Sequence, residues 1–233
     1  MSHLLRIPLM ALAWSCLAGS TPAADVHLGM GFRVGEVTHT GAIVWTRVTA
    51  VPERNRTGHR EPKKRTPRVR KYVRSPVPLG SRQGEIAGAV GEVRLHWKPA
   101  GDRSGGKTTD WVAVVPEHDY VHQFTIDGLK PAVSYQVTVE ARETSEARVS
   151  ATTGGTFSTP AVADTPQDVT FTVVTGQSYW DLDNPDGYHI YPAMARLKPQ
   201  FLVATGDTVY LDSEAPRART VGLARFHWHR MYS

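Results

Sequence analysis

The stretch that most constrains the fold lies near the carboxyl end of the 233-residue chain, where two strand-like runs flank a helix-like run. Residues 171–175 are apolar and β-branched, and residues 201–205 repeat that pattern; both runs precede a glycine and predict buried strands. Residues 188–198 have helical spacing and end before a proline. A connection of this length that contains a helix favours a parallel β-α-β crossover.

Polar side chains follow both predicted strands. Parallel strands end at the same edge of a sheet, so we expect Gln177, after the first strand, to lie beside Asp207, after the second. A carboxylate fixed just past a strand suits Mg²⁺, Ca²⁺, Mn²⁺ or ferric iron, and the phenol of Tyr210 suits a strongly Lewis-acidic ion such as Fe³⁺. The same residues also fit an ordinary turn in which Tyr210 packs, so the pattern alone leaves both interpretations open.

Residues 206–210, with the apolar run before them, resemble the strand and Gly-Asp-x-x-Tyr segment of the alkaline phosphatase D family of metallophosphoesterases. Residues 171–177 are similar to the preceding strand of that family. The resemblance implies that Asp207 bridges two metal ions in catalysis and that Tyr210 binds the ferric one. The implied metal pair is Fe³⁺ and Ca²⁺.

The sequence departs from the family pattern at one position. Family members commonly have a cysteine immediately before the Gln177 position, where it serves as a further iron ligand; this chain has Gly176 there. The departure implies an altered iron site. Asp181 and Asp183 follow in the loop that leaves the same edge, and we expect that one of them could reach back as a substitute ligand.

The resemblance implies an exported, metal-dependent phosphatase or phosphodiesterase, in which a metal-activated hydroxide attacks the phosphorus of a phosphate ester. The family's phosphatase domain contains several further strands, which carry an asparagine-histidine segment and more histidines and aspartates. No such segment follows Ser233 in the sequence. We therefore expect an incomplete phosphatase domain over residues 169–233, with little activity of its own.

Residues 1–24 are typical of an export signal. Arg6 gives a positive start, residues 7–17 form an apolar core and residues 20–24 offer small residues for cleavage. The apolar core is shorter than the run of about 20 residues that spans a membrane, so a transmembrane anchor is not expected. The protein is predicted to be periplasmic or extracellular.

Residues 25–160 predict an all-β sandwich. Apolar residues alternate along several short runs, and a turn leads into Tyr135, as in the tyrosine corner of immunoglobulin-like domains. We interpret this region as a fibronectin type III-like domain, which resembles the front domain of the phosphatase family. Residues 161–168 form a linker. The predicted fold is thus a sandwich followed by the first β-α-β unit of an α/β metallophosphoesterase domain.

Residues 54–74 form a strongly basic insertion in the sandwich. Their net charge is +9, whereas the whole chain carries +5. Prolines and the lack of apolar periodicity predict a disordered or extended loop, and the charge predicts contact with polyanions. Without interleaved aromatic residues, no specific nucleic-acid motif is indicated. The alternative function is therefore a non-catalytic secreted module that binds polyanions through Lys63, Lys64, Arg65, Arg68, Arg70 and Lys71.

The last segment, residues 216–233, predicts a helix. Val221, Ala224, Trp228 and Met231 would form one apolar stripe that packs on a sheet. Two histidines two residues apart on such a helix point in different directions and cannot bind one ion together, so they are expected to pack or to lie on the surface.

Overall fold

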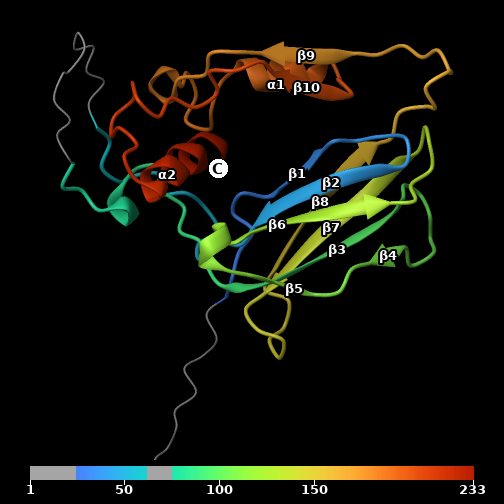
Figure 1. Ribbon diagram of the computed structural model, residues 1–233, viewed down its shortest axis with the longest axis horizontal. Helices are drawn as coiled ribbons and strands as arrows, with labels where there is room; N and C mark the ends of the chain where they lie inside the picture. The colour runs from blue at the N-terminus through green and yellow to red at the C-terminus, as the bar shows by residue number, and fades with distance from the viewer. Residues whose placement is uncertain (1–24, 62–74) are drawn as a thin grey trace, which may run out of the picture.

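The computed structural model describes residues 25–61 and 75–233 (Figure 1). The predicted export signal lies outside the described residues. So do the six basic residues proposed to bind polyanions: Lys63, Lys64, Arg65, Arg68, Arg70 and Lys71. Among the helices of the described part, none is long and apolar enough to cross a membrane.

The first and larger part is a sandwich of two antiparallel sheets. One sheet has the strand order β1-β2-β6, from β1 (Phe32–Gly35), β2 (Gly41–Arg47) and β6 (Val121–Asp127). The other has the order β4-β3-β7-β8, with β5 also paired to β3; it consists of β3 (Gly91–Pro99), β4 (Lys107–Thr108), β5 (Val112–Val114), β7 (Ser134–Arg142) and β8 (Ala151–Ser158).

The core lies between these two sheets, because each strand turns alternate side chains inward. Val44 on β2 and Phe124 on β6 face Leu95 on β3 and Val139 on β7, and all four are buried. The hydroxyl of Tyr135 accepts a hydrogen bond from the backbone nitrogen of Lys130 at 2.8 Å, which is the predicted tyrosine corner. The sandwich class predicted from alternation is confirmed.

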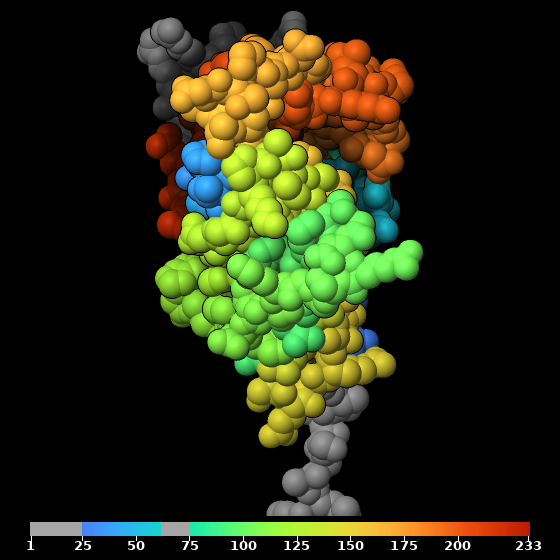
Figure 2. All heavy atoms as spheres, turned by 90° about the vertical axis from the view of Figure 1, so that its right-hand side faces the viewer, coloured from blue at the N-terminus to red at the C-terminus, as the bar shows by residue number. Residues whose placement is uncertain are grey.

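The second part begins with β9 (Phe171–Val174), continues through α1 (Ile190–Arg196) and returns in β10 (Phe201–Ala204). The two strands are parallel and in register, with Phe171 opposite Phe201 and Val174 opposite Ala204, so the predicted crossover is confirmed. Seen from the side, this unit and the linker, in orange, sit at one end of the sandwich (Figure 2).

The predicted burial of the two strands is wrong. Phe171, Val173, Phe201 and Leu202 are all about half exposed, because within the described residues no further layer covers this two-stranded sheet. The rings of Phe171 and Phe201 instead stack on each other, with centroids 5.3 Å apart. Strand periodicity predicts which residues pair, but burial also needs a partner surface.

The last helix, α2 (Val221–Tyr232), forms where predicted but buries a different face. Val221 is 68% and Trp228 48% exposed, so the predicted apolar stripe is wrong. The buried residues of α2 are Phe226, His227, His229 and Arg230. The helix packs beside the 3-10 turn η1 (Leu79–Ser81) and the end of the sandwich, where polar partners are available, and not on the β9–β10 sheet (Figure 1).

The beginning of the basic insertion, residues 54–61, is a loop as predicted, but it is an ordered one, so the prediction of disorder is wrong for this part. The backbone N–H of Asn55 donates to the carbonyl oxygen of Glu85 at 2.7 Å, and the backbone N–H of His59 donates to the carbonyl oxygen of Ser81 at 2.7 Å. These hydrogen bonds, with their return bonds, pair the segment with residues 81–85. Arg54 donates to the carbonyl of Pro185 and Arg56 forms an ion pair with Asp186, so these side chains are held against the α/β part.

Candidate functional site

The carboxyl ends of β9 and β10 lie side by side, as expected for parallel strands. The backbone nitrogen of Gln177 donates to the carbonyl of Asp207 at 2.8 Å, and Gly176 donates to Gly206 at 3.3 Å. Gly176 and Asp207 both have a left-handed backbone, with φ of 69° and 51°. Aspartate adopts this region more readily than most residues, and the sharp turn lifts its side chain off the strand end.

Asp207 and Tyr210 form a small polar pair at this edge. The Tyr210 hydroxyl donates to Asp207 Oδ2 at 3.2 Å, and the carboxylate is exposed. Desolvation, followed by the hydrogen bond to the Asp207 carboxylate and its charge, raises the pKa of Tyr210. A phenol with a raised pKa keeps its proton at neutral pH, so only a strongly Lewis-acidic ion would convert it to a phenolate ligand.

Gln177 connects this edge to the terminal helix. Its side chain is buried, and Nε2 lies 3.4 Å from the hydroxyl of Tyr232 on α2. The pair Gln177 and Asp207 predicted from sequence is thus brought together by the backbone, with the Gln177 amide turned toward α2. Sequence reasoning did not identify Tyr232, because no pattern relates a residue near the chain end to a strand 55 positions earlier.

The structure places the two proposed substitute ligands in the loop after Gln177. Asp181 ends the 3-10 turn η3 (Tyr179–Asp181). Asp183 Oδ1 accepts from the backbone nitrogen of His189 at 2.9 Å and lies 3.2 Å from His189 Nδ1. The backbone hydrogen bond, with the His189 ring, lowers the pKa of Asp183. A role for either carboxylate as a metal ligand stays a prediction.

The donor set at the strand ends was tested against the metal pair that the resemblance implies. Among the described residues, no three histidine, cysteine, aspartate or glutamate side chains come together in a way that could hold a metal ion. Asp207 and Tyr210 provide one carboxylate and one phenol, and Gly176 provides no side chain. These residues therefore do not fit a two-metal centre by themselves.

A buried polar network behind the strand ends was missed by the sequence analysis. Glu214 Oε2 accepts from Arg230 Nη2 at 2.5 Å, and its Oε1 accepts from the backbone nitrogen of Tyr179 at 2.8 Å. Arg230 also donates to His227 Nδ1 at 2.9 Å, and its guanidinium lies 4.5 Å from the centre of the Tyr179 ring. The signal available in the sequence was an arginine and a histidine three residues apart on one helix face.

Comparison with known proteins adds information on the fold. No family profile matches the sequence, and no curated protein is significantly similar to it. Among solved structures, PhoD matches 93% of this chain with a TM-score of 0.57 and 15% identity, and the chain spans 37% of PhoD. A redesigned β-sandwich protein matches 56% of this chain and 92% of its own, with a TM-score of 0.32 and 15% identity. The sensor domain of the anti-sigma factor RsgI4 from Pseudobacteroides cellulosolvens matches 60% of this chain and 76% of its own, with a TM-score of 0.33 and 18% identity. Only the first score is high enough to support an argument, and at 15% identity it shows that sandwich and β-α-β unit share the fold of PhoD.

Proposed function

We propose that this chain forms the first part of an exported, metal-dependent phosphoesterase of the alkaline phosphatase D type, which acts on phosphate monoesters or diesters. The observation that carries the proposal is the position of Asp207, whose backbone pairs with Gln177 at the ends of two parallel strands and whose carboxylate accepts from Tyr210. Open α/β sheets bind ligands at this edge. The likeness in fold to PhoD is consistent with the same activity.

In this proposal Asp207 and Tyr210 are metal ligands, and Fe³⁺ and Ca²⁺ are the proposed ions. Bound metal would supply Lewis-acid chemistry toward the phosphate ester. The two side chains do not complete a two-metal centre, and the described residues contain no cluster of three ligands. We therefore expect that the chain by itself binds iron weakly and shows little or no turnover.

Iron binding tests the assignment without relying on activity. The purified chain is titrated with Fe³⁺ and the visible absorption of an iron-phenolate bond is recorded. We expect a band that disappears in Tyr210→Phe and weakens in Asp207→Asn. Tyr120→Phe, on the sandwich side of the molecule, removes a different phenol and should leave the band unchanged. A band that persists in Tyr210→Phe contradicts the assignment of this residue.

Hydrolysis of nitrophenyl phosphate, measured with added Fe³⁺ and Ca²⁺, is the second test. The expected rate for the chain alone is close to the background rate. Substantial turnover that Asp207→Asn abolishes would support the phosphoesterase assignment and contradict the expectation that these residues need further ligands. Turnover that Asp207→Asn leaves intact would contradict the assignment itself.

A further inference from the structure

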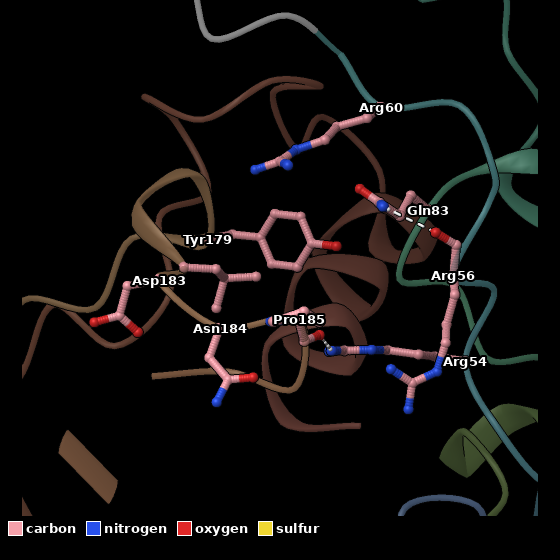
Figure 3. A pocket seen from close by; sticks show the side chains of 9 residues that line it. Arg54, Arg56, Arg60, Gln83, Tyr179, Asp183, Asn184 and Pro185 are labelled. Carbon is pink, nitrogen blue, oxygen red and sulfur yellow. Dashed lines mark hydrogen bonds between the residues drawn. The ribbon is translucent and has the colours of Figure 1, made fainter. Parts of the chain in front are cut away.

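A basic pocket lies where residues 54–60 meet the loop that follows β9. Its volume is about 430 Å³, and its lining comes from residues 54–60, from Gln83 and from residues 179–185 (Figure 3). Arg54, Arg56 and Arg60 line it on one side, and Tyr179 and Asn184 line it on the other. Neither Asp207 nor Tyr210 lines this pocket, and Asp183, the possible substitute ligand, is its one residue in common with the proposed metal site.

The arginines of the pocket differ in how far their charges are neutralised. Arg56 forms ion pairs with Glu53 and Asp186, at 3.1 and 2.7 Å. The guanidinium of Arg54 donates to two carbonyl oxygens, those of Pro185 and Arg230, and makes no direct ion pair with a carboxylate of the described residues.

Arg60 contributes a second charge held in place by aromatic rings. Its guanidinium lies 5.7 Å from the centre of the Tyr179 ring and 4.9 Å from that of Trp180. Cation-π contacts of this kind fix the orientation of a guanidinium and leave its N–H groups able to donate. The one carboxylate of the lining, Asp183, is already bonded to His189. The pocket therefore has a positive field.

Tyr179 is the feature that makes this pocket more than a charged surface. The residue is only 3% exposed, and among the described residues no group forms a hydrogen bond with its hydroxyl. Figure 3 shows the ring in the middle of the pocket with the hydroxyl directed toward Gln83 and Arg56. The guanidinium groups of Arg60 and Arg230 lie 5.7 and 4.5 Å from the centre of the ring, so the ring already packs against two cations. The group of Tyr179 that is available to a ligand is its hydroxyl.

Asn184 adds a further donor to the same space. Its Oδ1 accepts from the backbone nitrogen of Asp186 at 2.9 Å, which leaves the amide nitrogen Nδ2 without a partner in the part of the chain that the structure describes. A hydroxyl, an amide N–H₂ and guanidinium groups all donate hydrogen bonds, and they converge on one volume. An oxyanion with several acceptor oxygens satisfies such a set, and charge-assisted hydrogen bonds make the arrangement favourable.

We propose that this pocket, formed by Arg54, Arg60, Tyr179 and Asn184, binds a phosphate group, either as inorganic phosphate or as the head of a phosphate monoester. The site is separate from Asp207 and goes beyond the proposed metal-dependent activity. It would hold phosphate without any metal. The positive charge and the hydrogen-bond donors of the pocket select the ligand. Binding of phosphate here does not require the other basic residues of the insertion, which were predicted to contact polyanions.

The test is calorimetric titration of the purified chain with inorganic phosphate and, separately, with glycerol phosphate, in metal-free buffer at low ionic strength. Tyr179→Phe removes only the hydroxyl and keeps the ring that contacts the two guanidinium groups. We expect it to weaken binding about tenfold, as for the loss of one hydrogen bond to a charged group. Arg60→Gln should weaken binding by at least as much.

Two controls separate this site from general attraction and from the metal site. Arg103→Gln removes one charge from the exposed β3–β4 loop and should leave the affinity unchanged. Asp207→Asn should also leave it unchanged, so the pocket and the phosphoesterase assignment can fail independently. Binding of both ligands indicates an open pocket that accepts esters, and binding of phosphate alone indicates a site for the free ion.

The proposal is overturned by either of two results. One is that Tyr179→Phe and Arg60→Gln, with thermal unfolding close to that of the parent chain, bind phosphate as well as the parent does. The other is that Arg103→Gln lowers the affinity as much as Arg60→Gln does, which would mean that net charge alone attracts the anion.

Discussion

His229 on α2 donates from Nε2 to Asp119 Oδ2 at 2.7 Å, and this bond fastens the terminal helix to the sandwich. Asp119 follows the 3-10 turn η2 (Pro116–His118) and also forms an ion pair with Arg47 at 3.2 Å, whose side chain is 2% exposed. One carboxylate thus serves two buried partners from different parts of the fold. The α/β part is held in position by polar contacts of this kind, because its own sheet buries little apolar surface.

Asp119→Asn is expected to lower the free energy of unfolding by about 2 kcal/mol, the order expected for a hydrogen bond between charged groups that is partly open to solvent. Asn tolerates the left-handed backbone at this position, where φ is 57°, so the change tests the charge and not the turn. Chemical denaturation measures the effect. Asp110→Asn, at an exposed site, is the control and should change little; equal losses in both variants would contradict the assigned role.

The same carboxylate predicts a pH dependence. Burial alone would raise the pKa of Asp119, but the hydrogen bond from His229 and the charge of Arg47 hold the pKa below its usual value. A depressed folded pKa contributes stability above the unfolded value, about 3.9, and the contribution is lost as pH falls through the folded pKa. Denaturation midpoints measured from neutral pH downward should therefore fall at strongly acidic pH, and less steeply in Asp119→Asn.

His227 predicts a second pH effect at milder acidity. Burial, and then the charge of Arg230, lowers the pKa of His227 to about 4. Nε2 bonds to the carbonyl of Pro216 and must carry the hydrogen, so Nδ1 is the acceptor for Arg230 and the ring is neutral. Between about pH 6.5 and pH 4 the unfolded chain is protonated at His227 and the folded chain is not. The free energy of unfolding is therefore unaffected above about pH 6.5 and falls as pH drops toward 4, by about 3 kcal/mol at most.

The measurement for His227 is the denaturation free energy at several pH values between 7 and 4 for His227→Gln, with His39→Gln, an exposed histidine, as its control. His227→Gln is expected to lose stability at pH 7 and to show a flatter dependence on pH than the parent chain. A slope that His227→Gln leaves unchanged would mean that other groups produce it.

The sequence alone predicts that Gln177 and Asp207 lie next to each other. Their juxtaposition was predictable, because two short β-branched runs separated by a helix leave few alternatives to a parallel pair, and parallel pairs bring their carboxyl ends together. The partners of His227 and His229 were not predictable. These partners depend on which face of α2 packs against the rest of the molecule. Because α2 buries polar residues, its sequence has no apolar stripe that would identify the buried face.

The Glu214–Arg230 pair tests whether the buried network stabilises the fold. Their side chains are 6% and 3% exposed. Glu214→Gln leaves the guanidinium charge buried without a carboxylate, and breaking a buried pair in this way costs about 3 kcal/mol or more. Glu53→Gln, which breaks an exposed pair with Arg56, should cost far less, because solvent screens such pairs. Thermal unfolding of both variants provides the comparison, and similar losses would contradict a special role for the buried pair.

Gly176 allows the proposed iron site to be rebuilt, and this prediction rests on the proposed function. A Cβ added at Gly176 meets no atom within 4 Å, so there is space for a cysteine. The backbone is left-handed, however, with φ of 69°, and a residue other than glycine costs about 1 kcal/mol there. Gly176→Cys should therefore be slightly less stable without metal but should bind Fe³⁺ more tightly, because a thiolate joins Asp207 and Tyr210. The matched control is Gly31→Cys, which has a φ of 63°, equally open space and no carboxylate next to it in the sequence. It should lose the same stability and gain no iron affinity. If both variants gain iron affinity alike, the thiol binds iron by itself and the edge of β9 and β10 is not a metal site.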